Sequence, residues 1–152
     1  MPPVEQIPDE GEIHRQLDFP SMYNDAREMI WQNIFQFPGG QSESVVWSKY
    51  VPSADDVHRL GCEREASTRA RKPDMRYVGF ITSTAGAIRG ITTRAGHAFA
   101  VNHAPCEGVH HAEISYKAGG DRQPDQLKKN EKNELKLALQ AVFGELVSHS
   151  CT

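Results

Sequence analysis

The stretch from residue 76 to 117 constrains the fold more than any other part of the chain. It contains four short runs of strand-forming residues with turn-forming residues between them, among them Gly86, Gly96 and Pro105. The four runs are residues 76–83, 87–93, 97–103 and 110–117. Their spacing predicts an antiparallel meander of four strands.

The turn positions also predict which residues of the meander share a face. When the hairpins are centred on residues 84–85, 94–95 and 106–107, all three pairings place apolar residues and glycines on one face. The members of this set are Tyr77, Gly79, Ile81, Ile88, Gly90, Phe99, Val101, Ala112 and Ile114. A slip of one residue would scatter the set, so we expect helices to cover this face.

Helical patterns surround the predicted meander. Ser21 and Ser53 are favourable N-caps for two helices, one over residues 21–35 and one beginning at 53. Apolar residues at helical spacing predict a third helix over 125–148. With a further strand at 44–50, the order is α-β-α-β-β-β-β-α. This order predicts an α+β fold in which a four- to five-stranded antiparallel sheet has its helices packed on one face.

The first 18 residues differ from the rest of the chain. They contain Pro2, Pro3 and Pro8 among five acidic residues. This composition predicts a flexible acidic tail, either loose or docked on a partner, followed by a single α+β domain over 19–152.

Composition bears on the class of protein and its compartment. The net charge of −3 gives no reason to expect a protein that coats nucleic acid or a membrane surface, and no apolar run approaches the length of about 20 residues that a membrane helix needs. Cys62, Cys106 and Cys151 are odd in number and form no Cys-x-x-Cys pair. We therefore expect free thiols and a cytoplasmic protein.

The basic residues at the end of the second predicted helix allow two interpretations. Arg64, Arg69, Arg71 and Lys72 can complement the negative end of the helix dipole, or they can contact phosphate groups. No aromatic residues are interleaved with them, which favours the role at the helix end.

The histidines of the meander do not predict a metal site. His97 and His103 are six residues apart on one strand, or about 20 Å, so they cannot share an ion. His110 and His111 point to opposite faces of a regular strand. His111 and Glu113 then lack a third protein ligand, and we expect no metal. The chain also lacks the glycine motifs of nucleotide cofactor sites, so we expect no cofactor.

The polar face of the meander nevertheless carries a possible catalytic group. Arg89, Glu113 and His111 lie close together in the predicted register. A carboxylate base, a histidine acid and an arginine that stabilises phosphate charge can cleave RNA without a metal ion. These residues favour a metal-independent, ribonuclease-like hydrolase as the alternative function, and nucleic acid is an expected partner only under this alternative.

The same face carries apolar residues that suit a partner. Val78, Phe80 and Ile91, with Asn102 and Lys117 beside them, form a half-apolar surface of the kind that binds a protein or a second copy of the chain. Because the chain shows no catalytic motif, the leading prediction is a small protein-binding domain such as an adaptor, inhibitor or immunity-type protein. The alternative for this surface is that the N-terminal helix predicted over 21–35 covers it and makes it core.

Overall fold

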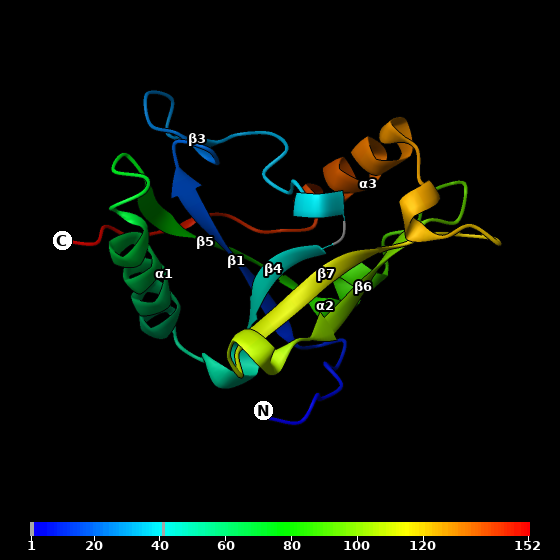
Figure 1. Ribbon diagram of the computed structural model, residues 1–152, viewed down its shortest axis with the longest axis horizontal. Helices are drawn as coiled ribbons and strands as arrows, with labels where there is room; N and C mark the ends of the chain where they lie inside the picture. Colours follow the sequence, from blue (N-terminus) through cyan, green and yellow to red (C-terminus); the bar gives the residue numbers. More distant parts are fainter. Residues whose placement is uncertain (1, 41) are drawn as a thin grey trace.

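The computed structural model describes residues 2–40 and 42–152 as an α+β fold (Figure 1). Its main sheet has six strands in the order β6-β7-β4-β1-β5-β8, and every adjacent pair is antiparallel. The strands of this sheet are β1 Glu12–Phe19, β4 Ser42–Trp47, β5 Arg76–Thr84, β6 Ala98–His103, β7 His111–Lys117 and β8 Val147–Ser148. The helices are α1 Ala54–Thr68, α2 Ala85–Arg89 and α3 Lys129–Ala141, with short 3-10 turns at Pro38–Gly40, Ser48–Tyr50, Pro105–Glu107 and Pro124–Gln126. No described helix is long and apolar enough to span a membrane.

Helices cover both faces of the sheet. On one face, which we call the α3 face, Ile88 of α2 and Leu135 and Leu139 of α3 pack in the larger core. On the other, the α1 face, α1 closes a smaller core made of Val46, Val51, Val57 and Phe80 with Leu60. The prediction of helices on one face is therefore wrong. The helix that begins at Ser53 follows β4 and packs against β5 from the opposite side.

The predicted meander is only partly present, because its second run is a helix. Thr84 does not open a hairpin turn. Its side chain caps α2 by accepting a hydrogen bond of 3.1 Å from the Ala87 backbone N–H. A hairpin centred on residues 84–85 would pair Ile81 with Ile88. That pairing is therefore wrong, and β1 and β8 take the places beside β5.

The last predicted hairpin is confirmed with a shifted register. β6 pairs with β7, and Val101 lies opposite Ile114. A hairpin centred on residues 106–107 would place Val101 opposite Ala112. A shift of two residues leaves every side chain on its predicted face, because side chains alternate along a strand. Phe99, Val101, Ala112 and Ile114 are buried accordingly.

The N-terminal segment is ordered rather than a flexible tail. Residues 12–19 form β1, a central strand between β4 and β5. Ile7 is buried, and the Glu5 backbone N–H donates to Nδ1 of His103 at 3.0 Å. Ile13 and Leu17 alternate into the core between polar residues, and this alternation was hidden by the acidic composition. Met1 lies outside the described residues.

The helix predicted over 21–35 is also wrong. This segment forms a two-strand hairpin, β2 Tyr23–Asn24 and β3 Met29–Ile30, and then an extended run that buries Ile34 and Phe35. A distant side chain satisfies hydrogen-bonding groups of its backbone. The amide oxygen of Gln140 accepts from the Ile34 N–H at 3.3 Å, and the amide nitrogen of Gln140 donates to the Trp31 carbonyl at 3.0 Å. Tertiary contacts therefore override the helical pattern.

A bulge changes the alternation of side chains along β5. The register between β1 and β5 shifts at Leu17 and Asp18, opposite Gly79. Gly79 has a φ of 138°, and a Cβ there would lie 2.1 Å from the Val147 carbonyl oxygen. Glycine is needed at this position because β8 packs directly against it.

The bulge and the helices bury most of the predicted partner surface. Val78 packs in the larger core, Phe80 packs under α1, and Ile91 is 9% exposed. Asn102 and Lys117 are exposed. The expectation of an open apolar face is therefore wrong. The alternative, cover by the helix predicted over 21–35, is wrong as well, because that segment is not helical and α1 packs on Phe80 instead.

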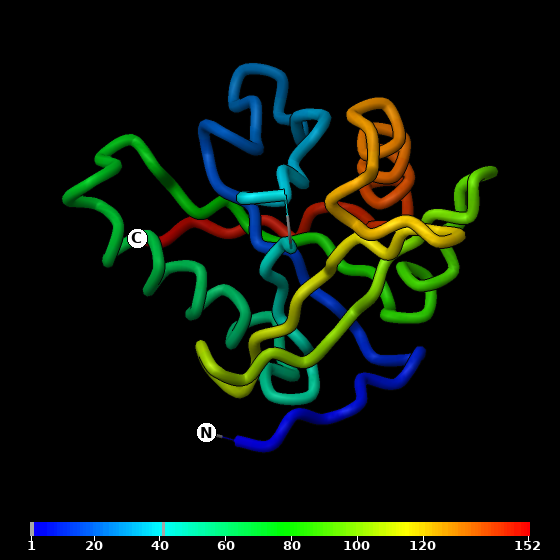
Figure 2. The backbone as a smooth tube through the Cα atoms, turned by 45° about the vertical axis from the view of Figure 1, so that its right-hand side comes forward, coloured from blue at the N-terminus to red at the C-terminus, as the bar shows by residue number. Residues whose placement is uncertain are grey.

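A disulfide joins Cys62 in α1 to Cys151, across 89 residues of sequence. Figure 2 shows the C-terminal segment running past β5 and ending beside α1. The expectation of free thiols is wrong for these two cysteines. The inference of a cytoplasmic location loses its basis with it, because disulfides persist mainly in oxidising compartments.

Candidate functional site

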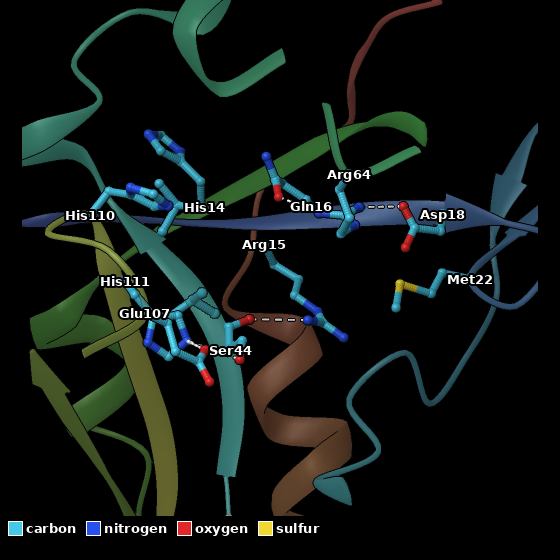
Figure 3. Close-up of a pocket in the computed structure, with 12 residues that line it drawn as sticks. His14, Arg15, Gln16, Asp18, Met22, Ser44, Arg64, Glu107, His110 and His111 are labelled. Atoms are coloured by element: carbon cyan, nitrogen blue, oxygen red, sulfur yellow. Dashed lines mark hydrogen bonds and ion pairs between the residues drawn. The ribbon is translucent and has the colours of Figure 1, made fainter. Parts of the chain in front are cut away.

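A cleft forms where β1 and β4 separate. The two strands pair only at Ile13–Trp47 and His14–Val46, after which β1 stays with β5 and β4 stays with β7. The sheet is thereby split into two halves. The opening between them is a cavity of about 310 Å³ (Figure 3). Its lining residues are His14, Arg15, Gln16, Asp18, Met22, Ser44, Val45, Val46, Arg64, Glu107, His110 and His111.

Arg15 bridges the split in place of the missing ladder bonds. Its guanidinium donates to the Ser44 carbonyl at 3.0 Å and lies 3.2 Å from the Glu43 carboxylate. The Nε atom of Arg15 is buried and has no hydrogen-bond partner among the described residues. Burial lowers the pKa of Arg15, whereas the Glu43 charge raises it. Arg15 thus places a buried cation at the split.

Arg64 reaches the cleft from α1. It donates to the side chains of Gln16 and Asp18 on β1, and Gln16 in turn donates to the Val57 carbonyl at 2.8 Å. These bonds fix the guanidinium at the end of the cleft next to Met22 (Figure 3). The sequence analysis identified Arg64 only as one of several basic residues near the end of a predicted helix.

His14 lies at the other end of the cleft on β1. Its Nδ1 is 2.8 Å from the hydroxyl of Thr82, and its ring contacts Phe80 edge-on at 4.8 Å between centroids. Burial lowers the pKa of His14, and the Glu12 charge opposes this effect. The imidazole is therefore mainly neutral at pH 7. Thr82 contacts the ring through Nδ1 and not through Nε2.

His110 enters the cleft from the loop before β7, and His111 enters it from the first position of β7. Nδ1 of His111 is 2.9 Å from the Ala104 carbonyl, which requires the proton on Nδ1, and Nε2 then accepts from the Ser44 hydroxyl at 3.0 Å. No hydrogen bond engages the His110 ring in the described chain. Burial lowers the pKa of His110, and so does the nearby His111.

The predicted trio is placed at separate points of the fold. His111 lines the cleft, whereas Glu113 lines a different hollow together with Ser42, Ser115 and other residues. Arg89 belongs to α2 and donates to Asp9 and to the Val101 carbonyl, each at 2.9 Å. The predicted register placed Arg89 near Glu113 only because residues 87–93 were expected to form a strand.

The cleft groups that the sequence analysis missed are His14, Arg15 and Gln16. They lie in the segment that was predicted to be a flexible tail. The available signal of a strand was limited to Ile13 and Leu17, which are four residues apart and therefore fall on one face of an extended segment.

The cleft brings cations and imidazoles together. Its two arginines are each paired with a carboxylate, Arg15 with Glu43 and Arg64 with Asp18. The imidazoles of His14 and His110, whose pKa burial lowers, can accept protons. Among the described residues, the ligand atoms close enough to share a metal ion belong to Cys62, His149 and Cys151, which lie outside the cleft.

Comparisons with known proteins do not assign the chain to a family. No family model, no curated protein and no solved structure matches it.

Proposed function

We propose that the protein is a metal-independent hydrolase that cleaves phosphodiesters in the cleft between β1 and β4, with RNA as the expected substrate. The observation that carries this proposal is the convergence of His14 and His110 with Arg64 on one cleft. An acid–base pair and a fixed positive charge are what such a reaction needs.

His110 and His14 are the groups suited to proton transfer. One neutral imidazole removes the proton from a ribose 2′-hydroxyl, whose oxygen then attacks phosphorus. The other imidazole acts in its protonated form, which is the minority form at pH 7 because burial lowers the pKa of both histidines. It gives its proton to the departing 5′-oxygen, and the products are a 2′,3′-cyclic phosphate and a free 5′-hydroxyl. In the second step the imidazoles exchange roles: one removes a proton from water, whose oxygen attacks the cyclic phosphate, and the other protonates the 2′-oxygen as its bond to phosphorus breaks, which leaves a 3′-phosphate and a free 2′-hydroxyl.

The remaining cleft residues position the substrate. The two ring nitrogens of His111 are already engaged by Ala104 and Ser44, so His111 orients the loop that carries His110. Arg64, held by Gln16 and Asp18, faces the phosphate charge. A fixed guanidinium stabilises developing charge without a cost of reorganisation.

The test is cleavage of a single-stranded RNA oligonucleotide by the purified full chain in the presence of EDTA. We expect wild-type cleavage, and a loss of about 100-fold or more in His110→Ala, because general acid–base groups contribute roughly 10²- to 10⁴-fold. Glu113→Gln and Arg89→Gln are the matched controls, because neither residue lines the cleft. Both should retain wild-type rates.

Two results would overturn this assignment. Wild-type protein that leaves RNA intact without metal would end the hydrolase proposal. A Glu113→Gln variant that is inactive beside a fully active His110→Ala variant would return the chemistry to the trio of Glu113, His111 and Arg89. Thermal unfolding of each variant establishes that it is folded.

Binding of a protein partner or of a second copy stays a prediction. Of the residues expected to form that surface, Asn102 and Lys117 are exposed and the apolar three are buried. Sedimentation of the purified chain as a monomer would remove the prediction of a homodimer.

A further inference from the structure

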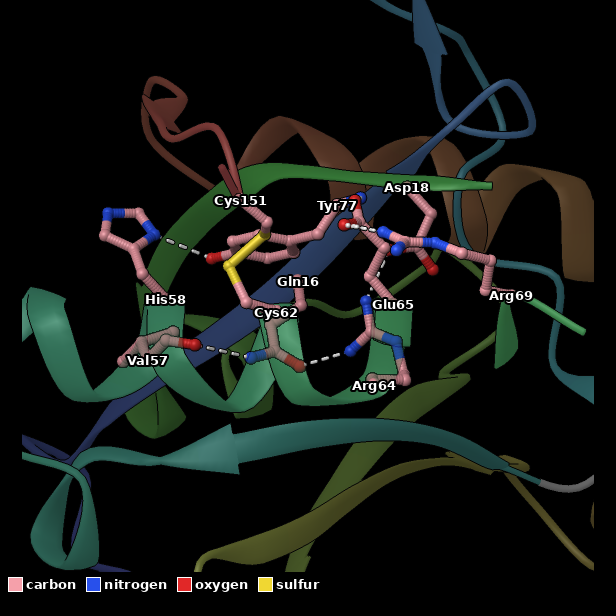
Figure 4. The surroundings of a disulfide bond; sticks show 10 residues. All are labelled: Gln16, Asp18, Val57, His58, Cys62, Arg64, Glu65, Arg69, Tyr77 and Cys151. Atoms are coloured by element: carbon pink, nitrogen blue, oxygen red, sulfur yellow. Dashed lines mark hydrogen bonds and ion pairs between the residues drawn. A yellow bond between two sulfur atoms is a disulfide. The ribbon is translucent and has the colours of Figure 1, made fainter. Parts of the chain in front are cut away.

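The disulfide has a third metal-ligating group beside it. The sulfurs of Cys62 and Cys151 and a ring nitrogen of His149 all lie within 4.8 Å of one another. Cys62 comes from the middle of α1, and Cys151 comes from the C-terminal segment after β8 (Figure 4). His149 belongs to the same segment and directly follows β8. Thiolate sulfur and imidazole nitrogen are the ligands that zinc prefers.

We propose that reduction of this disulfide creates a zinc site formed by Cys62, Cys151 and His149. A dithiol reduces the bond and is itself oxidised to a disulfide, which leaves two protein thiols. Zinc then binds both sulfurs as thiolates and the imidazole as a neutral ligand, and the two thiol protons are released to solvent. Water fills the fourth position of the tetrahedral ion.

The His149 ring is held in place before any metal binds. Its backbone N–H donates to the Val78 carbonyl at 3.0 Å, next to the pairing of β8 with β5. Its ring stacks on His58 with centroids 4.2 Å apart and an interplanar angle of 11°. His58 is in turn fixed by a contact of 2.8 Å between its Nδ1 and the Tyr77 hydroxyl. His58 is therefore a positioning residue for His149.

The site is accessible, and one of its ligands can adjust. Cys62, His149 and Cys151 line a surface hollow of about 460 Å³, and His149 is exposed. Two thiolates around zinc lie farther apart than two sulfurs in a disulfide, so one cysteine must move. Beyond His149, the backbone hydrogen bond of the tail joins Thr152 to Ser150, within the tail itself. Cys151 can therefore shift while α1 holds Cys62.

The sequence analysis missed this group because its spacing is not a standard motif. His149 and Cys151 are two residues apart, which places them on one side of an extended segment. Cys62 is distant in sequence, and only the packing of the C-terminal segment against β5 brings it near.

The test uses the full chain with Cys106→Ser, so that the thiols formed by reduction are Cys62 and Cys151. The protein is reduced with a phosphine under anaerobic conditions and titrated with Co²⁺, whose bonds to thiolate sulfur absorb in the near ultraviolet. We expect one Co²⁺ per chain with this absorption, and its displacement by Zn²⁺. The oxidised protein should show neither.

Variants separate ligands from neighbours. Cys151→Ser and His149→Ala should each weaken Zn²⁺ binding by more than about 100-fold, because loss of even an outer partner of a ligand costs about 10- to 100-fold. His58→Ala should weaken Zn²⁺ binding by about 10- to 100-fold and keep the thiolate absorption of the Co²⁺ complex. Circular dichroism of each reduced variant monitors folding.

The proposal is overturned if reduced protein binds no Co²⁺ with thiolate absorption. It is also overturned if folded His149→Ala binds zinc as tightly as the parent. Neither outcome bears on RNA cleavage, because this cluster lies outside the cleft.

Discussion

The carboxylate of Glu65 in α1 accepts a hydrogen bond of 2.8 Å from the backbone N–H of Tyr77 in β5. Tyr77 lies beside the bulge, where the ladder between β1 and β5 shifts register. A helix side chain therefore supplies the partner for a buried strand amide, and Glu65 is only 4% exposed. This contact joins α1 to the sheet beside the disulfide (Figure 4).

Glu65→Ala should lower the free energy of unfolding by about 1–3 kcal/mol, because it leaves the buried Tyr77 N–H without an acceptor. Urea denaturation measures this change. Glu63→Ala is the matched control, since Glu63 is exposed on the same helix, and it should change stability by less than about 0.5 kcal/mol. Equal effects of the two variants would show that the Tyr77 contact is unimportant.

Gly61→Ala should destabilise the protein although it improves helix propensity. Alanine is favoured over glycine by about 1 kcal/mol inside a helix. Here a Cβ would lie 2.3 Å from the ring of buried Tyr77, which must shift. Overpacking of this kind costs about 1–3 kcal/mol, so we expect a lower midpoint in thermal unfolding. A stabilised variant would contradict the close packing of α1 on Tyr77.

Leu135 and Leu137 should respond very differently to alanine. Leu135 is 0% exposed in the larger core, whereas Leu137, two residues along α3, is 54% exposed. Leu135→Ala should cost about 2–5 kcal/mol of unfolding free energy. Leu137→Ala should cost less than about 0.5 kcal/mol. The comparison by urea denaturation tests which face of α3 packs on the sheet, and a reversed order would contradict that placement.

His14 should make stability depend on pH. Burial lowers the pKa of His14 in the folded protein, and an unfolded histidine has a pKa of about 6.5. As the pH falls below about 6.5, the unfolded chain binds a proton that folded His14 does not, so stability is lost. Above that pH the contribution is fully present.

Urea denaturation between pH 5 and pH 8 measures this effect. The loss of stability toward pH 5 should be smaller in His14→Gln than in the wild type. An unchanged slope would mean that His14 protonates as readily in the folded chain as in the unfolded one.

Much of the local structure was predictable from the sequence. Ser53 caps α1 as expected, with its hydroxyl accepting from the Asp56 N–H at 3.1 Å. β5, β6 and β7 occur where strand-forming residues lie between turn signals. The final helix is also present, although it ends at Ala141 and the apolar pattern beyond it packs as a non-helical segment that leads to β8.

The errors occurred where the outcome depends on distant residues. Thr84 is compatible with a hairpin or with a helix cap, and the local sequence does not distinguish them. The N-terminal segment was judged by its charge, whereas Ile13 and Leu17 gain burial only once β4 and β5 lie on either side. The cleft was missed for the same reason, because it exists only between two strands that fail to pair along their length.

The α+β class, the helix caps, and the alternation that assigns side chains to the two faces of β6 and β7 all follow from local sequence. These features depend on neighbouring residues, whose spacing the sequence states directly. Tertiary structure decided the strand order, the covering of both faces, the assembly of His14, Arg64 and His110, and the approach of Cys62 to Cys151. Such contacts join residues far apart in the chain, and they are selected by burial of the whole core rather than by any local preference.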